Sequence, residues 1–248
     1  MSENIVLLHG FGGTHRTFDG VLELLSPTRY LPRALDLPGH GPDCHAAPVT
    51  FASCLEHVLS ESPPRFTLCG YSMGARIALA LALHAPERVS SLVLVSGTAG
   101  IEEASERAQR RAADAHLAER LEKEPFEDFI ERWNTQPLFA GDPPEVAELA
   151  TAELRRNRPE SLARVLRELG TGSMDPLWSR LVELQMPVSI LVGDRDHKFQ
   201  ALGRQMERLL ADPAFIQVNG GHRLALENPA ALAKTLEFCI ERDSQPGE

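Results

Sequence analysis

Short apolar segments recur along the chain and alternate with longer amphipathic ones. The apolar segments are mostly continuous and are bounded by Gly, Pro or Asp, which is typical of buried parallel strands. We expect six such strands, at residues 5–8, 33–36, 66–69, 91–95, 188–192 and 215–218. Helical patterns separate them at residues 17–25, 51–60, 73–84, 198–210 and 229–242. This alternation predicts an α/β fold with a mostly parallel, doubly wound sheet.

The segment between Val95 and Val188 contains no convincing strand pattern. Four amphipathic helices are expected there instead, at residues 104–122, 125–134, 144–157 and 159–169, three of them with proline near the start. We therefore predict a core formed by residues 1–98 and 181–248, with a helical lid inserted at residues 99–180. The polar tail, residues 243–248, is expected to fray.

The composition is that of an ordinary globular protein, with 248 residues of which 43% are hydrophobic and 24% charged. No apolar run is long enough for a membrane span, and the first strand pattern starts too early to leave room for a signal peptide. The formal net charge of −10 disfavours nucleic acid as a partner. The many arginines of the predicted lid share their segment with glutamates, so we interpret most as solvent-exposed ion pairs and a few as candidates for an anion pocket.

The four cysteines show no C-x-x-C spacing, and reduced thiols in the cytoplasm are the favoured interpretation. Cys44 and His45, which lie close to His40, are conceivable metal ligands. An exposed polar loop explains them better, and we expect neither a metal nor a cofactor. We expect a monomer or a weak homo-oligomer.

The segment Gly70-Tyr71-Ser72-Met73-Gly74 joins a strand pattern to a helix pattern. Strand, G-x-S-x-G and helix together are typical of a nucleophile elbow, in which a strained turn projects the serine hydroxyl from the sheet. A plain turn serine is the alternative. Glycines on either side are expected because strand and helix cross closely there.

A serine hydroxyl needs an imidazole and a carboxylate to act as a base or a nucleophile. His222 follows the last predicted strand, and Asp194 and Asp196 follow the one before it. All lie at carboxyl ends of strands, where open parallel sheets place their sites. His57, His84 and His116 fall in helical patterns and are interpreted as surface residues.

The first predicted strand is followed by Leu8-His9-Gly10-Phe11-Gly12-Gly13. A glycine-rich loop at this place lets backbone amides approach a ligand, and we expect the amides of Phe11 and Met73 to form an oxyanion site. The loop DLPGHG that starts at Asp36 is interpreted as architectural.

The segments HGFGG, DLPGHG, GYSMG, GDRD and GGH resemble the α/β-hydrolase superfamily across nearly the whole chain. The G-x-x-D pattern of that superfamily favours Asp196 as the acid, and Asp194 would then cap the loop.

A narrower resemblance is to the 2-succinyl-6-hydroxy-2,4-cyclohexadiene-1-carboxylate synthases of menaquinone biosynthesis. It rests on the elbow GYSMGAR, the lid segment ERAQRRAAD from Glu106, the pattern W-x-x-x-P-x-F from Trp133, and the segments GDRDHKF and GHRLALENP. The chain departs from that family in Ser96-Gly97-Thr98-Ala99-Gly100, where proline is usual, and at Ala75, where glycine is common.

This resemblance implies a lyase that eliminates pyruvate from a polycarboxylate substrate without an acyl-enzyme. Ser72, activated by His222 and Asp196, would remove a carbon-bound proton. The family match assigns carboxylate binding to Arg76, Arg110 and Arg155, because arginine binds carboxylates in a bidentate manner. It assigns the shaping of the pocket to Tyr71 and Trp133.

Three alternatives stay open at this point. Arg76 could form a surface salt bridge. The same triad could serve a carboxylesterase or thioesterase through an acyl-serine, although a lid rich in arginine favours the lyase. A hydrolase fold could also be a non-catalytic receptor, which an intact triad argues against.

Overall fold

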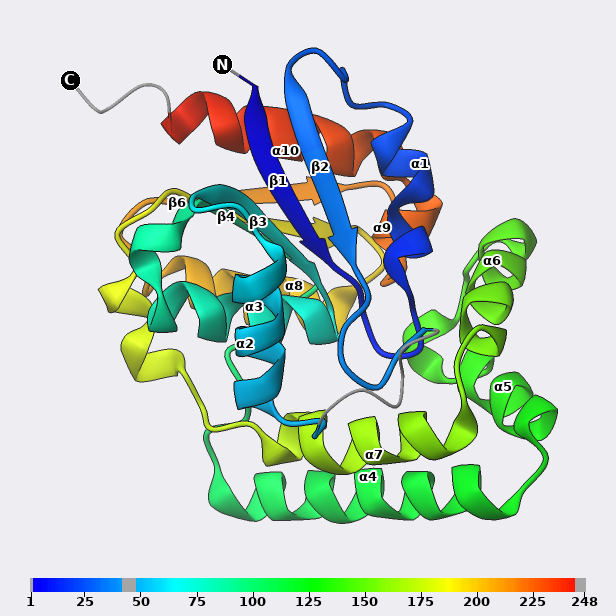
Figure 1. Cartoon of the computed structure of the whole chain (residues 1–248). Coiled ribbons are helices and arrows are strands. Elements are labelled where there is room, and N and C mark those ends of the chain that lie inside the picture. The colour runs from blue at the N-terminus through cyan, green and yellow to red at the C-terminus, as the bar shows by residue number, and fades with distance from the viewer. Residues whose placement is uncertain (1, 42–47, 244–248) are drawn as a thin grey trace.

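The computed structural model describes residues 2–41 and 48–243 (Figure 1). Cys44, His45 and the end of the predicted tail lie outside the described residues. Six strands form one sheet in the order β2-β1-β3-β4-β5-β6, and every neighbouring pair is parallel. They are β1 (Glu3–Leu8), β2 (Tyr30–Leu35), β3 (Phe66–Tyr71), β4 (Val89–Val95), β5 (Val188–Gly193) and β6 (Pro213–Val218).

Each predicted strand is present, and most are longer than the apolar pattern alone indicates. The largest difference is in β2, which starts at Tyr30 because Tyr30 and Leu31 pair with the beginning of β1. The side chain of Tyr30 is also buried. Backbone pairing at an edge strand leaves little trace in the hydrophobic pattern, so this extension could not be predicted.

Successive residues of each strand face opposite sides of the sheet, and both sides are covered by helices. Val6 and Leu8 of β1 pack with α2 (Phe51–Glu61), α3 (Met73–His84) and α8 (His197–Glu207). Ile5 and Leu7 pack on the other side with α1 (Asp19–Leu22), α9 (Leu224–Glu227) and α10 (Pro229–Asp243). Burial on both faces explains why the strands are continuous apolar segments.

The segment that was expected to form one helix at residues 17–25 is a 3₁₀ turn at His15–Phe18 followed by the single turn of α1. Thr14 caps the 3₁₀ turn through its side chain. Gly20 lies inside the short α1 and lowers its helix propensity, which disfavours a longer helix.

Helices fill the interval between β4 and β5, as predicted. They are α4 (Ala104–Lys123), α5 (Phe126–Asn134), α6 (Pro144–Arg155) and α7 (Pro159–Leu169), with short 3₁₀ turns between and after them. We call this part the helical insertion. In Figure 1, α4 and α7 lie side by side beyond the end of the sheet toward which β1 and β2 point, and α5 and α6 lie beside them.

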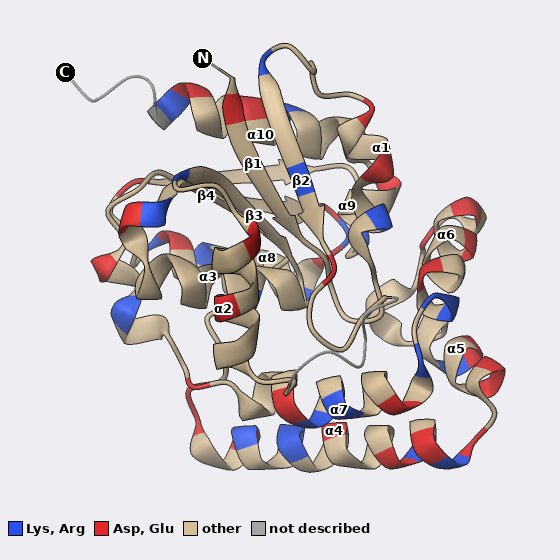
Figure 2. Ribbon diagram, viewed as in Figure 1, with Lys and Arg blue, Asp and Glu red and all other residues tan. Residues whose placement is uncertain are grey.

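Acidic and basic residues are interspersed along the insertion (Figure 2). Many of its arginines form ion pairs there, including Arg120 and Arg132 with Glu124 and Arg167 with Glu122. Most of the charge in this segment is therefore paired at the surface. In residues 2–41 and 48–243, no helix is long and apolar enough to cross a membrane.

Candidate active site

The turn between β3 and α3 holds Ser72 in a backbone conformation that side chains rarely adopt. Its φ is 54° and its ψ is −107°. Such strain persists only where the surroundings enforce it, and it is common at catalytic residues. A Cβ atom on Gly74 would lie 2.1 Å from the carbonyl oxygen of Leu8, and one on Gly70 would lie 2.2 Å from that of Gly74. Strand and helix therefore cross so closely that both positions require glycine.

Ser72, His222 and Asp196 are brought together by loops that follow three different strands. The Oγ atom of Ser72 lies 3.0 Å from Nε2 of His222, and Nδ1 of His222 lies 2.8 Å from Oδ2 of Asp196. Asp196 and His222 are both almost completely buried. A carboxylate at Nδ1 fixes the tautomer in which Nε2 is free to accept the serine proton.

Asp194 has the other role that the sequence suggested for it. Its Oδ1 accepts a hydrogen bond of 3.0 Å from the amide of Gly220, just before the histidine loop. Asp194 thus joins the loop after β5 to the loop after β6. Of the two aspartates, only Asp196 forms a hydrogen bond with His222.

Aromatic rings surround the imidazole of His222. The ring of Phe199 lies 4.6 Å from it between centroids, that of Tyr71 lies 5.6 Å away and that of Phe139 lies 6.0 Å away. Because these rings limit the access of water, interactions between charges in the site are strengthened.

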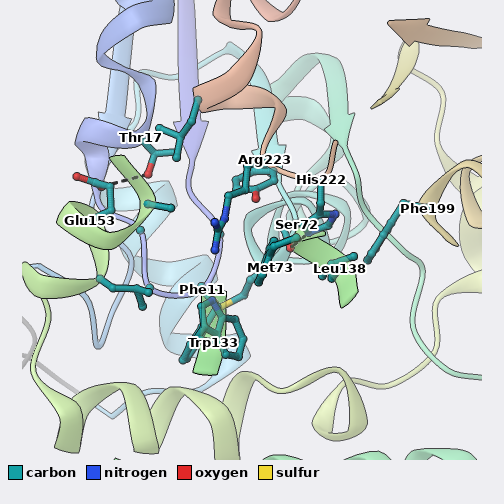
Figure 3. Close-up of a pocket in the computed structure, with 18 of the residues that line it drawn as sticks. Phe11, Thr17, Ser72, Met73, Trp133, Leu138, Glu153, Phe199, His222 and Arg223 are labelled. Atoms are coloured by element: carbon teal, nitrogen blue, oxygen red, sulfur yellow. Dashed lines mark hydrogen bonds between the residues drawn. The ribbon is translucent and has the colours of Figure 1, made fainter. Parts of the chain in front are cut away.

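A pocket opens above Ser72, and both expected oxyanion residues line it (Figure 3). The amides of Phe11 and Met73 have no hydrogen-bond partner among the residues that the structure describes. Met73 is the first residue of α3, where the amide has no acceptor within the helix. Two free amides next to the serine can stabilise an oxygen that develops negative charge.

Arg76 is buried at the wall of this pocket, with only 7% of its surface exposed. Its guanidinium donates a hydrogen bond of 2.7 Å to the carbonyl of Leu169, at the end of α7. Burial lowers the pKa of Arg76 to about 10, and the positive charge of Arg110 acts in the same direction. No carboxylate forms an ion pair with Arg76 in the described part of the chain, so the alternative of a surface salt bridge is excluded.

Arg110 also lines the pocket, and Arg107 and Arg111 of the same helix do not. Its Nε lies 2.9 Å from both carboxylate oxygens of Asp114, one turn further along α4. Burial raises the pKa of the Asp114 carboxyl, although Arg110 opposes this effect. Arg110 therefore reaches the pocket with its charge partly compensated.

Arg155 is not brought to the pocket in this structure. More than half of its side chain is exposed, and its guanidinium binds the carboxylate of Glu127 at the surface of the insertion, with Nη2 2.6 Å from Oε2. The family match assigned Arg155 by its place in the sequence, which does not tell in which direction the helix presents the side chain. Tyr71 and Trp133, the other predicted binding residues, do line the pocket.

A family model described as the alpha/beta hydrolase family matches residues 5–235. A 2-succinyl-6-hydroxy-2,4-cyclohexadiene-1-carboxylate synthase from Salmonella agona (strain SL483) is 32% identical over 237 residues, which cover 94% of this chain and 92% of the relative. The chain belongs to the α/β-hydrolase family and, within it, to the 2-succinyl-6-hydroxy-2,4-cyclohexadiene-1-carboxylate synthases.

Solved structures agree with the α/β-hydrolase fold. MenH from S. aureus superposes with a TM-score of 0.91 at 29% identity and covers 98% of this chain and 95% of its own. An enol-lactonase from Burkholderia xenovorans LB400 has a TM-score of 0.80 at 19% identity, covers 97% of this chain and 92% of its own, and is similar in fold.

Two basic residues of the pocket were missed by the sequence analysis of this synthase-family chain. Lys198 follows the acid loop and lines the pocket from an exposed position, and its pKa is lowered by partial desolvation and by the charge of Arg110. Arg223 follows His222, and it is buried against Asp142 with Nη1 2.9 Å from Oδ2. Both residues lie within quoted motifs, so their positions in the sequence were visible, but the direction of the Arg223 side chain depends on its contacts with the insertion.

No group of three or more His, Cys, Asp or Glu side chains in residues 2–41 and 48–243 is arranged to hold a metal ion. The chemistry described above needs only groups of the chain itself: a serine activated by an imidazole, two amides and several fixed cations.

Proposed function

We propose that the protein is a lyase that eliminates pyruvate from a succinyl-enolpyruvyl-hydroxycyclohexene carboxylate and forms 2-succinyl-6-hydroxy-2,4-cyclohexadiene-1-carboxylate, a step of menaquinone biosynthesis. The observation that carries the proposal is the burial of Arg76 in the pocket that holds Ser72, where its guanidinium forms no ion pair with any carboxylate of the described residues and Asp114 acts on it only at longer range. Burying an unpaired charge is costly, and an anionic ligand compensates for it.

In this mechanism the Ser72–His222–Asp196 triad acts as a base. His222 accepts the serine proton at Nε2, and the Ser72 oxygen takes a carbon-bound proton from the substrate. The electron pair left on carbon gives the second ring double bond as the bond to the enolpyruvyl oxygen breaks. The departing enolate takes up the proton held on Nε2 of His222 and becomes pyruvate, which restores the neutral imidazole. The amides of Phe11 and Met73 stabilise the negative charge that builds up on the adjacent succinyl ketone oxygen.

The substrate is a polycarboxylate, and the basic residues of the pocket are suited to it. We propose that Arg76 binds one carboxylate directly and that Arg110 and Lys198 assist, because all three line the same pocket. Trp133 and Tyr71 provide apolar surface for the ring. Arg155 is left out of this set on account of its ion pair with Glu127.

We also propose that the enzyme works in the cytoplasm, where the buried thiols of Cys54 and Cys69 would stay reduced. The residues named above all come from one chain, which is compatible with a monomer or a weak homo-oligomer.

The proposal is tested by a coupled assay that follows pyruvate release from the menaquinone precursor, with a p-nitrophenyl ester assayed in parallel. We expect rapid pyruvate release and slow ester cleavage. A carboxylesterase or thioesterase with the same triad would give the opposite result.

A further inference from the structure

The loop that carries the Phe11 amide is held from the side of the helical insertion. Residues 9–14 connect β1 to the 3₁₀ turn His15–Phe18, and many of their polar backbone atoms form hydrogen bonds. The Gly12 amide donates to Nε2 of His40 at 3.2 Å, and the Gly13 amide donates to the carbonyl of Gly10 at 3.1 Å. In contrast to the amides of Gly12 and Gly13, the Phe11 amide has no acceptor in the described structure.

Asn157, just beyond the end of α6, bridges two loops of the core. Its Nδ2 donates a hydrogen bond of 2.9 Å to the carbonyl of Gly12, and its Oδ1 accepts one of 2.9 Å from the amide of Gly41. The side chain is buried. The Gly12 carbonyl shares a peptide plane with the Gly13 amide, which donates to the Gly10 carbonyl. Because the Gly10 carbonyl and the Phe11 amide belong to one peptide, Asn157 restricts the orientation of the Phe11 amide through these bonds.

Glu153, in the last turn of α6, holds the far end of the same loop. Its Oε2 accepts hydrogen bonds of 2.8 Å from the Thr14 amide, 2.7 Å from the Thr14 hydroxyl and 3.2 Å from the Thr17 hydroxyl. Its Oε1 accepts one from Nε of Arg156. Figure 3 shows the bond between Glu153 and Thr17 at the edge of the pocket, with Phe11 and Ser72 further inside.

Apolar contacts join the same partners. Gly12 has a φ of 73°, and a Cβ atom there would lie 2.4 Å from Cδ2 of Leu154, so α6 packs directly on the loop. The ring of Phe11 belongs to the apolar cluster of the insertion and lies 4.7 Å from that of Trp133 between centroids. The side chain of Phe11 thus packs against the insertion, whereas its amide lies at the active site.

We propose that Glu153 and Asn157 are positioning residues, through which the end of α6 aims the Phe11 amide at the developing oxyanion. Neither needs to touch the substrate. The consequence is that one half of the oxyanion site is formed only when the helical insertion is docked on the core. The effect on turnover rests on the proposed lyase function, but the geometry of the oxyanion site does not.

The test measures the oxyanion site independently of the lyase reaction. Phenylboronic acid adds to the Ser72 oxygen, the serine proton passes to His222, and the resulting tetrahedral adduct places a boron-bound oxygen among the oxyanion donors. Its dissociation constant is measured by calorimetry for the wild type and four variants. In Asn157→Asp the acceptor for Gly41 remains but the donor to Gly12 is lost. In Glu153→Ala all acceptors for Thr14 and Thr17 are lost, whereas Glu153→Gln keeps one.

Asn157→Asp and Glu153→Ala are expected to weaken boronate binding about tenfold or more, since removing one oxyanion donor entirely costs about a hundredfold or more in rate. Glu153→Gln should retain affinity within about threefold of the wild type. The exposed Glu148 lies on the same helix, and Glu148→Ala is the matched control, expected to bind as the wild type does. Pyruvate assays should show the same factors in kcat, with KM changed by less than about threefold, because the carboxylates of the substrate are bound elsewhere.

Folding of each variant is checked by its thermal unfolding transition. If Asn157→Asp and Glu153→Ala fold and bind boronate as tightly as the wild type, the inference is overturned. It is also overturned if the wild type itself does not bind boronate, because no working oxyanion site would then exist. If Glu153→Ala does not fold, the test rests on Asn157→Asp and Glu153→Gln. Boronate binding by Asn157→Asp as tight as that of the wild type would then contradict the inference. A wild type that releases no pyruvate but shows the expected order of boronate affinities would refute the lyase and leave this inference standing.

Discussion

At the scale of single residues, two arginines of the pocket differ in their partners. Arg110 is paired with Asp114, whereas the buried Arg76 forms no ion pair in the described structure. Its guanidinium donates to the carbonyl of Leu169 and lies 5.9 Å from the centre of the Phe51 ring, and the Asp114 carboxylate acts on it only at longer range. A guanidinium in this situation is ready to bind a carboxylate in bidentate geometry, which an ammonium does not reproduce.

Replacing Arg76 should therefore act on substrate binding. We expect Arg76→Met to raise KM about 10- to 100-fold, because a charge-assisted hydrogen bond contributes about 1.5–3 kcal/mol. Arg76→Lys should recover only part of this. Steady-state kinetics with the precursor measure the effect, and Arg180→Met, which removes an exposed ion pair with Glu183, is the control. Equal KM values for Arg76→Met and the control would refute the role of Arg76.

Lys198 gives the site a pH dependence with a definite sign. Its pKa is lowered from 10.5, first by desolvation and then by Arg110, so the ammonium loses its proton at a lower pH than an ordinary lysine. The cation is present below that pKa and lost above it, and KM for the polyanionic substrate should rise as the pH increases.

Measuring KM from about pH 7 to about pH 9 checks this expectation and stays below the pKa of about 10 of Arg76. Lys198→Arg is the comparison, because an arginine at this exposed position stays charged over that range. The alkaline rise in KM should be reduced in Lys198→Arg. The same rise in both proteins would assign it to another group.

At the scale of elements, the crossing of β3 and α3 fixes the position of Ser72. Gly74→Ala should destabilise the fold by about 3 kcal/mol or more, because the new methyl group meets the backbone of β1 rather than a movable side chain. Gly20→Ala is the matched control. A Cβ atom there makes only an ordinary contact of 3.4 Å with Pro229, and the change should be neutral or stabilising by up to about 1 kcal/mol.

Denaturant unfolding of the two variants gives both free energies. A Gly74→Ala protein as stable and as active as Gly20→Ala would show that the elbow is less constrained than its geometry indicates.

The strands and helices could largely be predicted from the sequence, whereas the directions of individual side chains could not. Apolar patterns located all six strands and the helices of the insertion, because burial on both faces of a parallel sheet leaves a strong signal. Chain order and strand ends likewise located Ser72 and His222, and family resemblance favoured Asp196 over Asp194. Arg155, by contrast, matched a family motif and yet lies against Glu127 at the surface.

Arg223 is the opposite case, a pocket residue that the sequence analysis did not assign. Its guanidinium lies 3.8 Å from the centre of the Phe139 ring and binds Asp142, and both partners are contributed by the insertion. Contacts of this kind depend on how the insertion and the core are placed against each other. No periodicity in either segment reports that placement.

At the scale of the whole molecule, the fold separates two kinds of charge. The chain carries a formal net charge of −10, with much of the charge of the insertion paired at its surface (Figure 2). The pocket between the insertion and the carboxyl ends of the strands is lined by Arg76, Arg110, Lys198 and Arg223. These four cations are gathered in one pocket next to the serine, which suits the polycarboxylate substrate that we propose.

The most direct test of the account compares pyruvate release by the wild type and by Ser72→Ala, with the same purified precursor and with thermal unfolding to show that both proteins are folded. We predict that the wild type releases pyruvate and that Ser72→Ala is slower by about a thousandfold or more. Pyruvate release by a folded Ser72→Ala protein at the wild-type rate would contradict the claim that this serine is the catalytic base.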